Sequence, residues 1–107
     1  MERILIVARL RRPGVEQEIA ERFGASDRTE LPRLAGTLSR SLFSFHGLYF
    51  HFSEVKDTAK QAIDRIRDHP DFISLSQSLR PFVEAYDPET WRAPEDAMAR
   101  EFYRWEA

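Results

Sequence analysis

The chain has 107 residues, of which 42% are hydrophobic and 12% aromatic. This length fits one domain, and we expect residues 1–107 to fold as a single unit, because domains usually span about 50 to 250 residues. Its formal charge of −2 excludes the strongly basic surface that nucleic acid or anionic lipid would attract.

The chain contains no cysteine, which excludes disulfides, thiolate metal sites and a cysteine nucleophile, so we expect a cytoplasmic protein. Residues 4–10 are apolar but are interrupted by Arg9. This run is too short for a signal sequence or for the ~20 residues that cross a bilayer. It predicts a strand, and no membrane segment is expected.

The first part of the chain alternates between two periodicities. Residues 3–10 are rich in branched side chains and predict a buried strand. Residues 13–23 carry apolar side chains at steps of three and four, which predicts a helix that ends at Gly24. Residues 24–34 are polar and contain Pro32, so they indicate a connecting loop.

Residues 36–45 and 48–54 predict a β-hairpin, with His46 and Gly47 as its two-residue turn. If Phe45 pairs with Leu48, then Leu42 lies opposite His51 and Arg40 opposite Ser53. Alternation along the strands then places a phenylalanine-rich set on one face and a mixed polar set on the other. We expect helices to cover the first set (Phe43, Phe45, Leu48, Phe50, Phe52, with Ser39 and Ser41) and leave the second open (Arg40, Leu42, Ser44, Tyr49, His51, Ser53).

The second half predicts a helix over residues 55–67, a break at His69-Pro70 and a further helical piece to about residue 79. Residues 81–86 predict a fourth strand, 87–98 an irregular excursion, and 100–105 a last short strand. The order is βαββαβ plus a C-terminal strand, which indicates a ferredoxin-like α+β fold.

The mixed set of the hairpin is typical of a ligand pocket, where a few polar groups stand among apolar ones. Arg40 and His51 are diagonal neighbours, close enough to touch one ligand. The three histidines lie at a turn, a strand and a helix end rather than at ligand spacing, so no metal site is expected.

Four stretches carry a resemblance to a known family: DRTELP at 27–32, LFSFHGLYFH at 42–51, His69-Pro70 and EFYRW at 101–105. They resemble the tetracenomycin-type family of aromatic polyketide cyclases over nearly the whole chain. The resemblance implies a homodimeric α+β barrel, whose protomers turn their open sheet faces toward each other. It also implies aldol-type ring closure and dehydration of a poly-β-ketone in aromatic polyketide biosynthesis, without cofactor, and association with type II polyketide synthase components.

By this resemblance, Asp27, Arg40 and His51 are the expected catalytic residues. Imidazole exchanges protons near neutral pH, a guanidinium can hold an enolate oxygen, and the carboxylate can orient the imidazole or relay a proton. The alternatives are a structural histidine, an ion-paired arginine and a capping aspartate. Relatives can carry a histidine where this chain has Ser26. The expected substrate-binding set is Arg9, Ser26, Ser44, Tyr49, Ser53 and Trp91, with Trp91 and the tail also candidates for the dimer contact.

Two other functions are compatible with the same sequence features. The same barrel architecture suits a cofactor-independent monooxygenase that oxidises an anthrone-like phenol with O₂, since fold alone does not decide chemistry. A dimer that only binds and sequesters hydrophobic polyketides is the non-enzymatic alternative.

Overall fold

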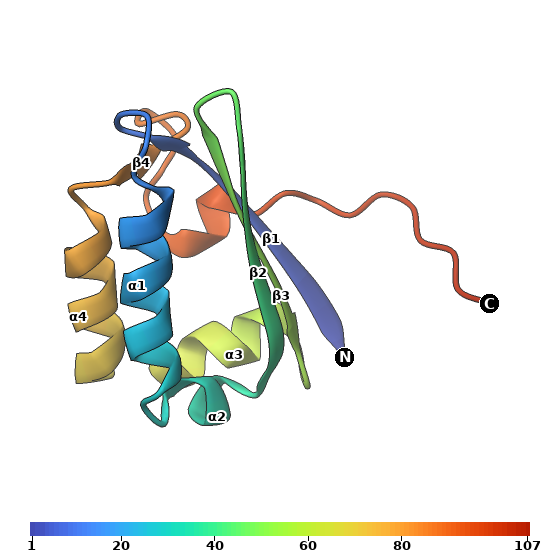
Figure 1. The fold of residues 1–107 in the computed structure, drawn as a ribbon. Coiled ribbons are helices and arrows are strands. Elements are labelled where there is room, and N and C mark those ends of the chain that lie inside the picture. The colour runs from blue at the N-terminus through green and yellow to red at the C-terminus, as the bar shows by residue number, and fades with distance from the viewer.

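The computed structural model describes residues 1–107 and consists of two layers, a four-stranded antiparallel sheet with helices against one of its faces (Figure 1). The strand order is β2-β3-β1-β4. Together with the element order this is the expected ferredoxin-like α+β fold.

The sheet is built around β1 (Glu2–Leu10) and β3 (Leu48–Val55), which pair along their lengths. The edges are β2 (Thr37–Phe45) and the three-residue β4 (Val83–Ala85). The predicted hairpin register is confirmed, with Leu42 opposite His51 and Arg40 opposite Ser53. His46 and Gly47 both adopt positive φ, 48° and 79°, the conformation that a two-residue hairpin turn requires.

The segment after β1 is more helical than expected. Helix α1 (Glu16–Asp27) continues through Gly24, because the buried Ser26 packs in its last turn. The loop expected over residues 24–34 is therefore wrong, and it also contains α2 (Leu31–Ala35). Helix α2 ends at Gly36, whose φ of 75° is left-handed, a conformation that favours glycine.

The two later helices have side-chain caps at their starts. Helix α3 (Ala59–Ile66) begins after Thr58, which forms a capping box with Gln61. It starts later than predicted because residue 55 still belongs to β3. Helix α4 (Pro70–Leu79) follows His69, whose Nδ1 accepts a hydrogen bond from the Asp71 N–H.

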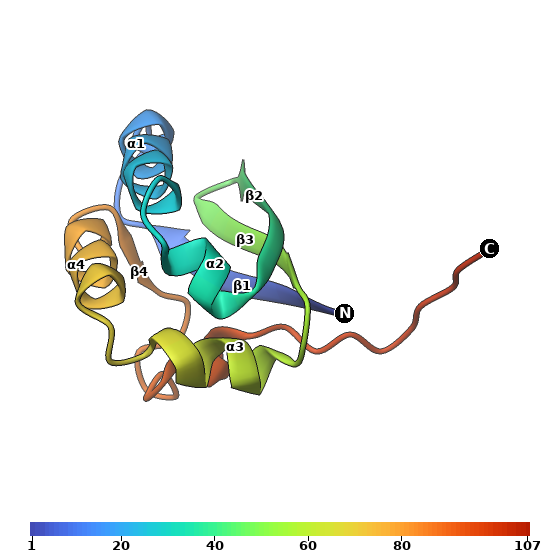
Figure 2. The same cartoon turned by 90° about the horizontal axis from the view of Figure 1, so that it is seen from below.

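Residues 87–98 form the expected irregular excursion, apart from the short 3-10 helix η1 (Pro94–Ala97). The strand predicted at residues 100–105 is wrong: after Met98 pairs with Ile6, the chain leaves the body as an extended tail (Figures 1 and 2). An extended segment becomes a strand only when a neighbour accepts its hydrogen bonds, and this tail has no such neighbour within the chain.

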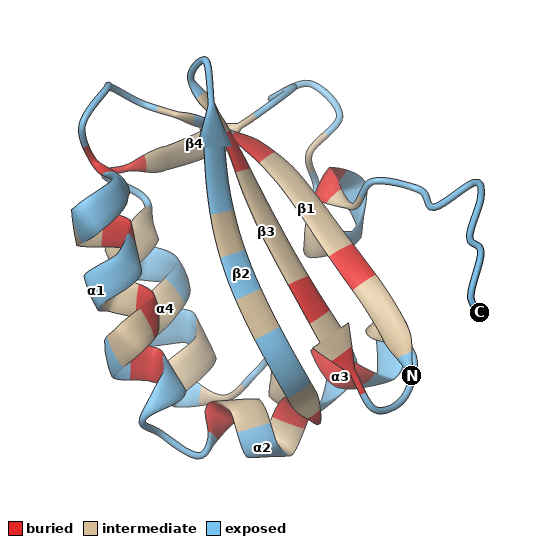
Figure 3. Cartoon of the chain, turned by 45° about the vertical axis from the view of Figure 1, so that its right-hand side comes forward, coloured by how far each residue is buried: buried red, intermediate tan, exposed pale blue.

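The helices cover the opposite sheet face from the one expected. Tyr49 and Ser53 are buried beneath them, at 5% and 6% exposure, whereas Phe43 and Phe45 are 58% and 64% exposed. Figure 3 shows how much of β2 remains uncovered. The right-handed β1–α1–β2 crossover selects the helical side of the sheet, and this geometry outweighs the apolar content of the other side. We call the covered side the cavity face and the phenylalanine-rich side the open face.

The buried residues form two separate clusters rather than one core. One cluster joins α1 to Tyr49 and Phe82, and the other joins Ile4 and Val55 to Ala35 and Ala62. Figure 2 shows the helices that surround the cavity face. None of the helices is long and apolar enough to cross a membrane.

Candidate active site

A cavity of about 540 Å³ lies between the cavity face and the helices. Eighteen of its 28 lining residues are hydrophobic, a composition suited to a flat, mainly apolar ligand. Its polar wall is on the hairpin, where Arg40, Tyr49, His51 and Ser53 all line it. The structure thus brings these four predicted residues together, although on the face that we expected to be open.

Asp27 holds Arg40 in a fixed orientation. Arg40 Nε lies 3.2 Å and 3.1 Å from the two carboxylate oxygens of Asp27, and its second terminal nitrogen donates to Oδ1 at 2.9 Å. The Arg40 side chain is 17% exposed and that of Asp27 39%. This fork-shaped pairing links the last residue of α1 to the middle of β2 and leaves one terminal nitrogen of Arg40 for other partners.

That remaining nitrogen donates to His51. Arg40 Nη1 lies 2.7 Å from His51 Nε2. A guanidinium carries no acceptor lone pair, so Nε2 must accept this bond. The neutral ring therefore carries its proton on Nδ1, and Asp27, Arg40 and His51 form one hydrogen-bonded chain.

The surroundings of His51 keep it uncharged. Burial, reinforced by the positive charge of Arg40, lowers the pKa of His51 from 6.5 to about 3. The expectation that His51 exchanges protons near neutral pH does not fit this environment, because the ring is neutral well below that pH. Any acid–base role requires a change in the charge beside it.

Phe23 contacts both members of this pair. Its ring centroid lies 5.0 Å from that of His51 in an edge-on arrangement, and 5.1 Å from the Arg40 guanidinium carbon. Phe23 is 5% exposed and lines the cavity. The sequence indicated Phe23 only as part of the apolar stripe of a helix, so its place beside the catalytic candidates was missed.

Two hydroxyl groups on the cavity wall have no hydrogen-bond partner in the protein. Tyr49 and Ser53 line the cavity, and no polar side-chain atom of the chain is both fully enclosed and unpartnered. Their hydroxyls must therefore reach the cavity space. Burial raises the pKa of Tyr49, opposed in part by Arg40, so its phenol stays protonated and able to donate.

Three of the expected substrate-binding residues lie outside the cavity lining. Arg9 is on the open face, where Nε donates to the Tyr86 carbonyl at 3.2 Å. Ser44 is exposed near the hairpin turn, and its hydroxyl lies 3.2 Å from Glu16. Ser26 is buried in α1, so these three positions do not fit direct contact with a ligand in the cavity.

Trp91 does line the cavity and packs against the cluster around Tyr49. Besides Phe23, three charged lining residues were missed by the sequence reasoning: Arg11, Arg80 and Glu84. The only signal for the two arginines was the density of arginine near the ends of predicted elements. No three potential ligand side chains gather anywhere in the chain in a way that could hold a metal ion.

Comparison with known proteins identifies the family of this chain. Residues 2–106 match the polyketide synthesis cyclase family. The chain is 50% identical to an uncharacterized protein of Streptomyces coelicolor, over 99% of this chain and 96% of that one. It is 46% identical to polyketide synthase CurG of Streptomyces cyaneus, over 99% and 98% of the two chains.

Its fold is similar to that of tetracenomycin F2 cyclase from Streptomyces glaucescens, a type II polyketide cyclase. The TM-score is 0.89 at 33% identity, and the match covers 100% of this chain and 99% of the other. The motifs at residues 27–32 and 42–51, the sequence match over the whole chain and the shared fold all agree. The chain belongs to the tetracenomycin-type family of polyketide synthesis cyclases.

Proposed function

We propose that this chain closes a ring of an aromatic poly-β-ketone intermediate by aldol-type condensation followed by loss of water, using only its own side chains. The observation that carries the proposal is the Asp27–Arg40–His51 chain in the wall of a mainly apolar cavity. The names of the polyketide synthase and cyclase relatives support a polyketide intermediate as substrate.

Arg40 is the group that stabilises negative charge. Aldol closure turns a carbonyl oxygen of the substrate into an enolate oxygen, whose negative charge develops in the transition state of proton removal. A guanidinium held by Asp27 meets that charge without reorganising, and its permanent charge suits this role better than that of a base. The free hydroxyls of Tyr49 and Ser53 supply further hydrogen bonds to the substrate carbonyls.

His51 acts as the proton carrier once the substrate takes the hydrogen bond of Arg40. The freed Nε2 lone pair accepts a proton from the activated methylene, and the C–H electron pair moves into the enolate. An enolate beside Arg40 also cancels part of the charge that lowers the pKa of His51. The ring therefore becomes a stronger base as the reaction proceeds.

Carbon–carbon bond formation returns the proton. The enolate carbon attacks a second ketone, its carbonyl electrons move onto oxygen, and the new alkoxide takes the proton from His51 Nε2. In the dehydration, His51 removes another proton from the α-carbon and delivers it to the departing hydroxyl, which leaves as water. The net change is one new ring and one lost water.

The proposal includes a homodimer formed through the open face. Phe43 and Phe45 are more than half exposed there, and the tail carries Phe102 at 90% exposure and Trp105 at 73%. Exposed apolar groups of this extent are typical of interaction surfaces. A second copy that turns the same face inward would cover them with two-fold symmetry.

The direct test is product analysis. A minimal aromatic polyketide synthase is run with wild-type protein, with His51→Ala and without either, and the products are separated and identified by mass spectrometry. The proposal expects a product with one more ring and one water fewer, formed fastest with wild-type protein and independently of O₂. Dependence on O₂ would instead indicate a monooxygenase. Tight product binding without a change in ring-closure rate would indicate a sequestering protein.

A further inference from the structure

The cavity has one polar wall and one apolar wall. Among the lining residues that are buried or half-buried, every charged or hydroxyl-bearing side chain belongs to the sheet. These residues are Thr37, Arg40, Tyr49, His51, Ser53 and Glu84. The buried and half-buried lining residues of the helices and of the 87–98 excursion carry no charged, hydroxyl or amide group. A ligand in the cavity therefore meets most of its hydrogen-bond partners on the sheet side.

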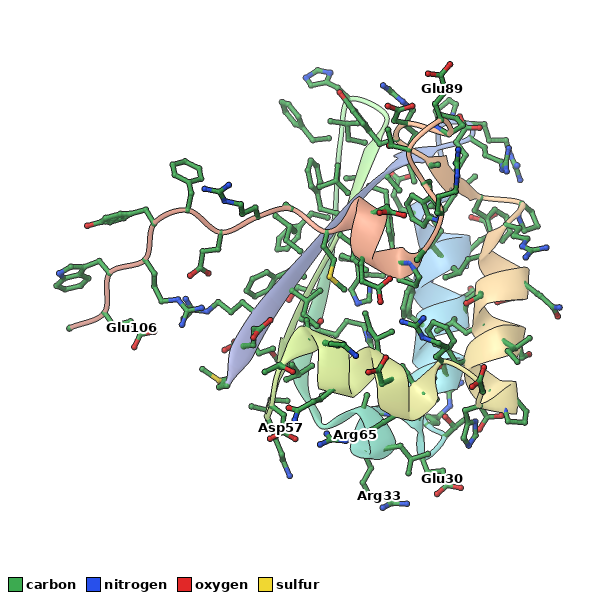
Figure 4. The ribbon with its side chains drawn as sticks, turned by 180° about the vertical axis from the view of Figure 1, so that it is seen from behind. Glu30, Arg33, Asp57, Arg65, Glu89 and Glu106 are labelled. Atoms are coloured by element: carbon green, nitrogen blue, oxygen red, sulfur yellow. The ribbon has the colours of Figure 1, made fainter.

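The helices at one end of the cavity turn their charged side chains outward. Arg33 of α2 pairs with Glu30. Arg65 of α3 pairs with Asp57. Figure 4 shows these four side chains together at the outer end of the molecule. The same helices line the cavity with alanine, proline, leucine and isoleucine, so this wall offers dispersion contacts to a flat ligand rather than hydrogen bonds.

The polar lining residues outside the hairpin are paired with each other or exposed. Glu84 forms an ion pair with Arg11 at 3.1 Å. Arg11, Ser76 and Arg80 are the exposed residues of the lining. The polar groups that remain free inside the cavity therefore lie on the β2–β3 hairpin.

Tyr49 and Ser53 stand on either side of His51 along β3. The three residues alternate along the strand, so their side chains share one face. At ~3.3 Å per residue, the Cα atoms of Tyr49 and Ser53 are about 13 Å apart, which is the length of several fused rings rather than of one. Tyr49 belongs to one buried cluster, and Ser53 pairs with Ile4 of the other. The row therefore runs along the cavity from one cluster to the other.

The hydroxyls at the two ends of this row are free to donate. Neither has a partner in the protein, and both reach the cavity space. Burial raises the pKa of Tyr49, so its phenol keeps its proton. Arg40, on the neighbouring strand, has donors and no acceptor. The hairpin wall thus suits ligand oxygens that accept hydrogen bonds, and an edge without such oxygens would leave its buried donors unsatisfied.

The direction of these hydrogen bonds fixes how a flat ligand stands. A donor to a carbonyl oxygen lies near the plane of the carbonyl and its substituents. Donors on a single wall therefore reach several oxygens of a flat molecule only when its plane stands upright on the sheet, with one edge along β3. The ring faces and the opposite edge then contact the apolar wall.

We propose that Tyr49 and Ser53 select an aromatic polyketide whose oxygens lie along one long edge, and that they hold this edge against β3. The inference rests on the proposed function for the class of ligand. It makes the two hydroxyls specificity-determining, because they decide which edge of the substrate faces Arg40 and His51. An isomer with its oxygens shared between both edges would bury some of them against the apolar wall without partners.

Two isomeric probes test this inference without turnover. In 1,8-dihydroxyanthraquinone both hydroxyls share one long edge with a carbonyl, whereas in 1,5-dihydroxyanthraquinone they lie on opposite edges. Binding is measured by fluorescence quenching in a Trp105→Phe background, which leaves Trp91 of the cavity lining as the only tryptophan. We expect the 1,8-isomer to bind about fivefold more tightly. Equal affinities, or binding of both isomers too weak to measure, would overturn the proposal.

The variant Tyr49→Phe/Ser53→Ala removes the two hydroxyls and leaves the rest of the wall. It should bind the 1,8-isomer about fivefold more weakly and the 1,5-isomer within about twofold of the parent, so that the preference largely disappears. The matched control, Tyr86→Phe/Ser76→Ala, removes the same groups from exposed positions and should keep the preference. Thermal unfolding checks that both variants fold. A preference that survives in the first variant, or is lost in the control, would refute the assignment.

Binding and turnover separate this inference from the proposed function. A protein that prefers the 1,8-isomer through the two hydroxyls but closes no ring would refute the proposed function alone. A protein that closes the ring but binds both isomers equally would refute the edge selection alone.

Discussion

Arg40 donates a hydrogen bond to His51 Nε2 across 2.7 Å, so the positive partner approaches the basic nitrogen of the imidazole. In most acid–base sites a carboxylate contacts the histidine and raises its basicity. Here the carboxylate, Asp27, contacts the arginine instead. The resting site therefore has a neutral imidazole beside a fixed cation, which is a suitable environment for an anionic intermediate.

Removing either member of this pair should slow ring closure without unfolding the protein. We expect His51→Ala and Arg40→Ala each to reduce kcat/KM by about 10²- to 10⁴-fold, with His51→Ala near the lower end because poly-β-ketone methylenes are already acidic. Arg40→Lys should recover only part of the rate, since it keeps the charge but loses the fork. Wild-type kinetics in both alanine variants, with unchanged circular dichroism, would reject the site.

His51 should also make stability depend on pH. Its pKa is about 3 in the folded chain and 6.5 when unperturbed, so between these values the unfolded chain binds a proton that the folded chain does not. The free energy of unfolding therefore falls as pH falls through this window, by up to about 1.4 kcal/mol per pH unit, and this contribution is complete above pH 6.5. The free energy of unfolding, measured with urea at several pH values in this window, should depend less steeply on pH for His51→Gln than for wild type. Equal pH dependence in the two proteins would contradict the low pKa.

Phe23 should act through the two residues that its ring contacts. We expect Phe23→Leu to lower kcat more than it changes KM. It should also move the pKa of His51 upward, because the imidazole becomes less enclosed. Phe72→Leu is a matched control, because Phe72 lines the cavity but contacts neither His51 nor Arg40 with its ring. Each substitution removes part of an aromatic ring and should cost less than the ~3 to 5 kcal/mol of stability lost in a Phe→Ala change. NMR titration of His51 is the measurement, and an identical pKa in both variants would exclude the positioning role.

The open face should control the oligomeric state. Phe43→Glu/Phe45→Glu introduces charges where the sheet is exposed, so we expect sedimentation to shift from dimer to monomer while circular dichroism stays the same. Ser74→Glu/Gln77→Glu, at two exposed positions of α4 on the other side of the sheet, is the control with the same added charge and should remain dimeric. A wild-type monomer at micromolar concentration would count against the barrel arrangement.

The hairpin shows how far local sequence rules reach. Its register follows from the His46-Gly47 turn, because a two-residue turn fixes Phe45 opposite Leu48 and every later pair with it. Which face the helices cover does not follow from these rules. The phenylalanines suggested a core, but the handed crossover through α1 places the helices over Arg40, Tyr49 and His51. Apolar content identifies a surface that needs covering and leaves open whether the same chain covers it.

The catalytic candidates were recognisable by motif, but their electrostatics were not. The hairpin register alone brings Arg40 near His51, whereas the contact with Asp27 depends on α1 extending beyond Gly24. The low pKa of His51 and the position of Phe23 depend on burial, which requires the packed helices. Arg9 and Ser44 show the opposite error, since each has a suitable side chain but lies outside the cavity.

Because the cavity separates the two buried clusters, the protein has a gap where a domain of this size would ordinarily place its core. Only 16 of 107 residues are buried. An aromatic polyketide in that gap would act as the missing hydrophobic side chains and join the two halves of the interior. We therefore expect product or a product analogue to stabilise the fold, by about 2.7 kcal/mol at a concentration 100 times its Kd. The stability of the fold and the occupancy of the cavity would then depend on the same apolar contacts.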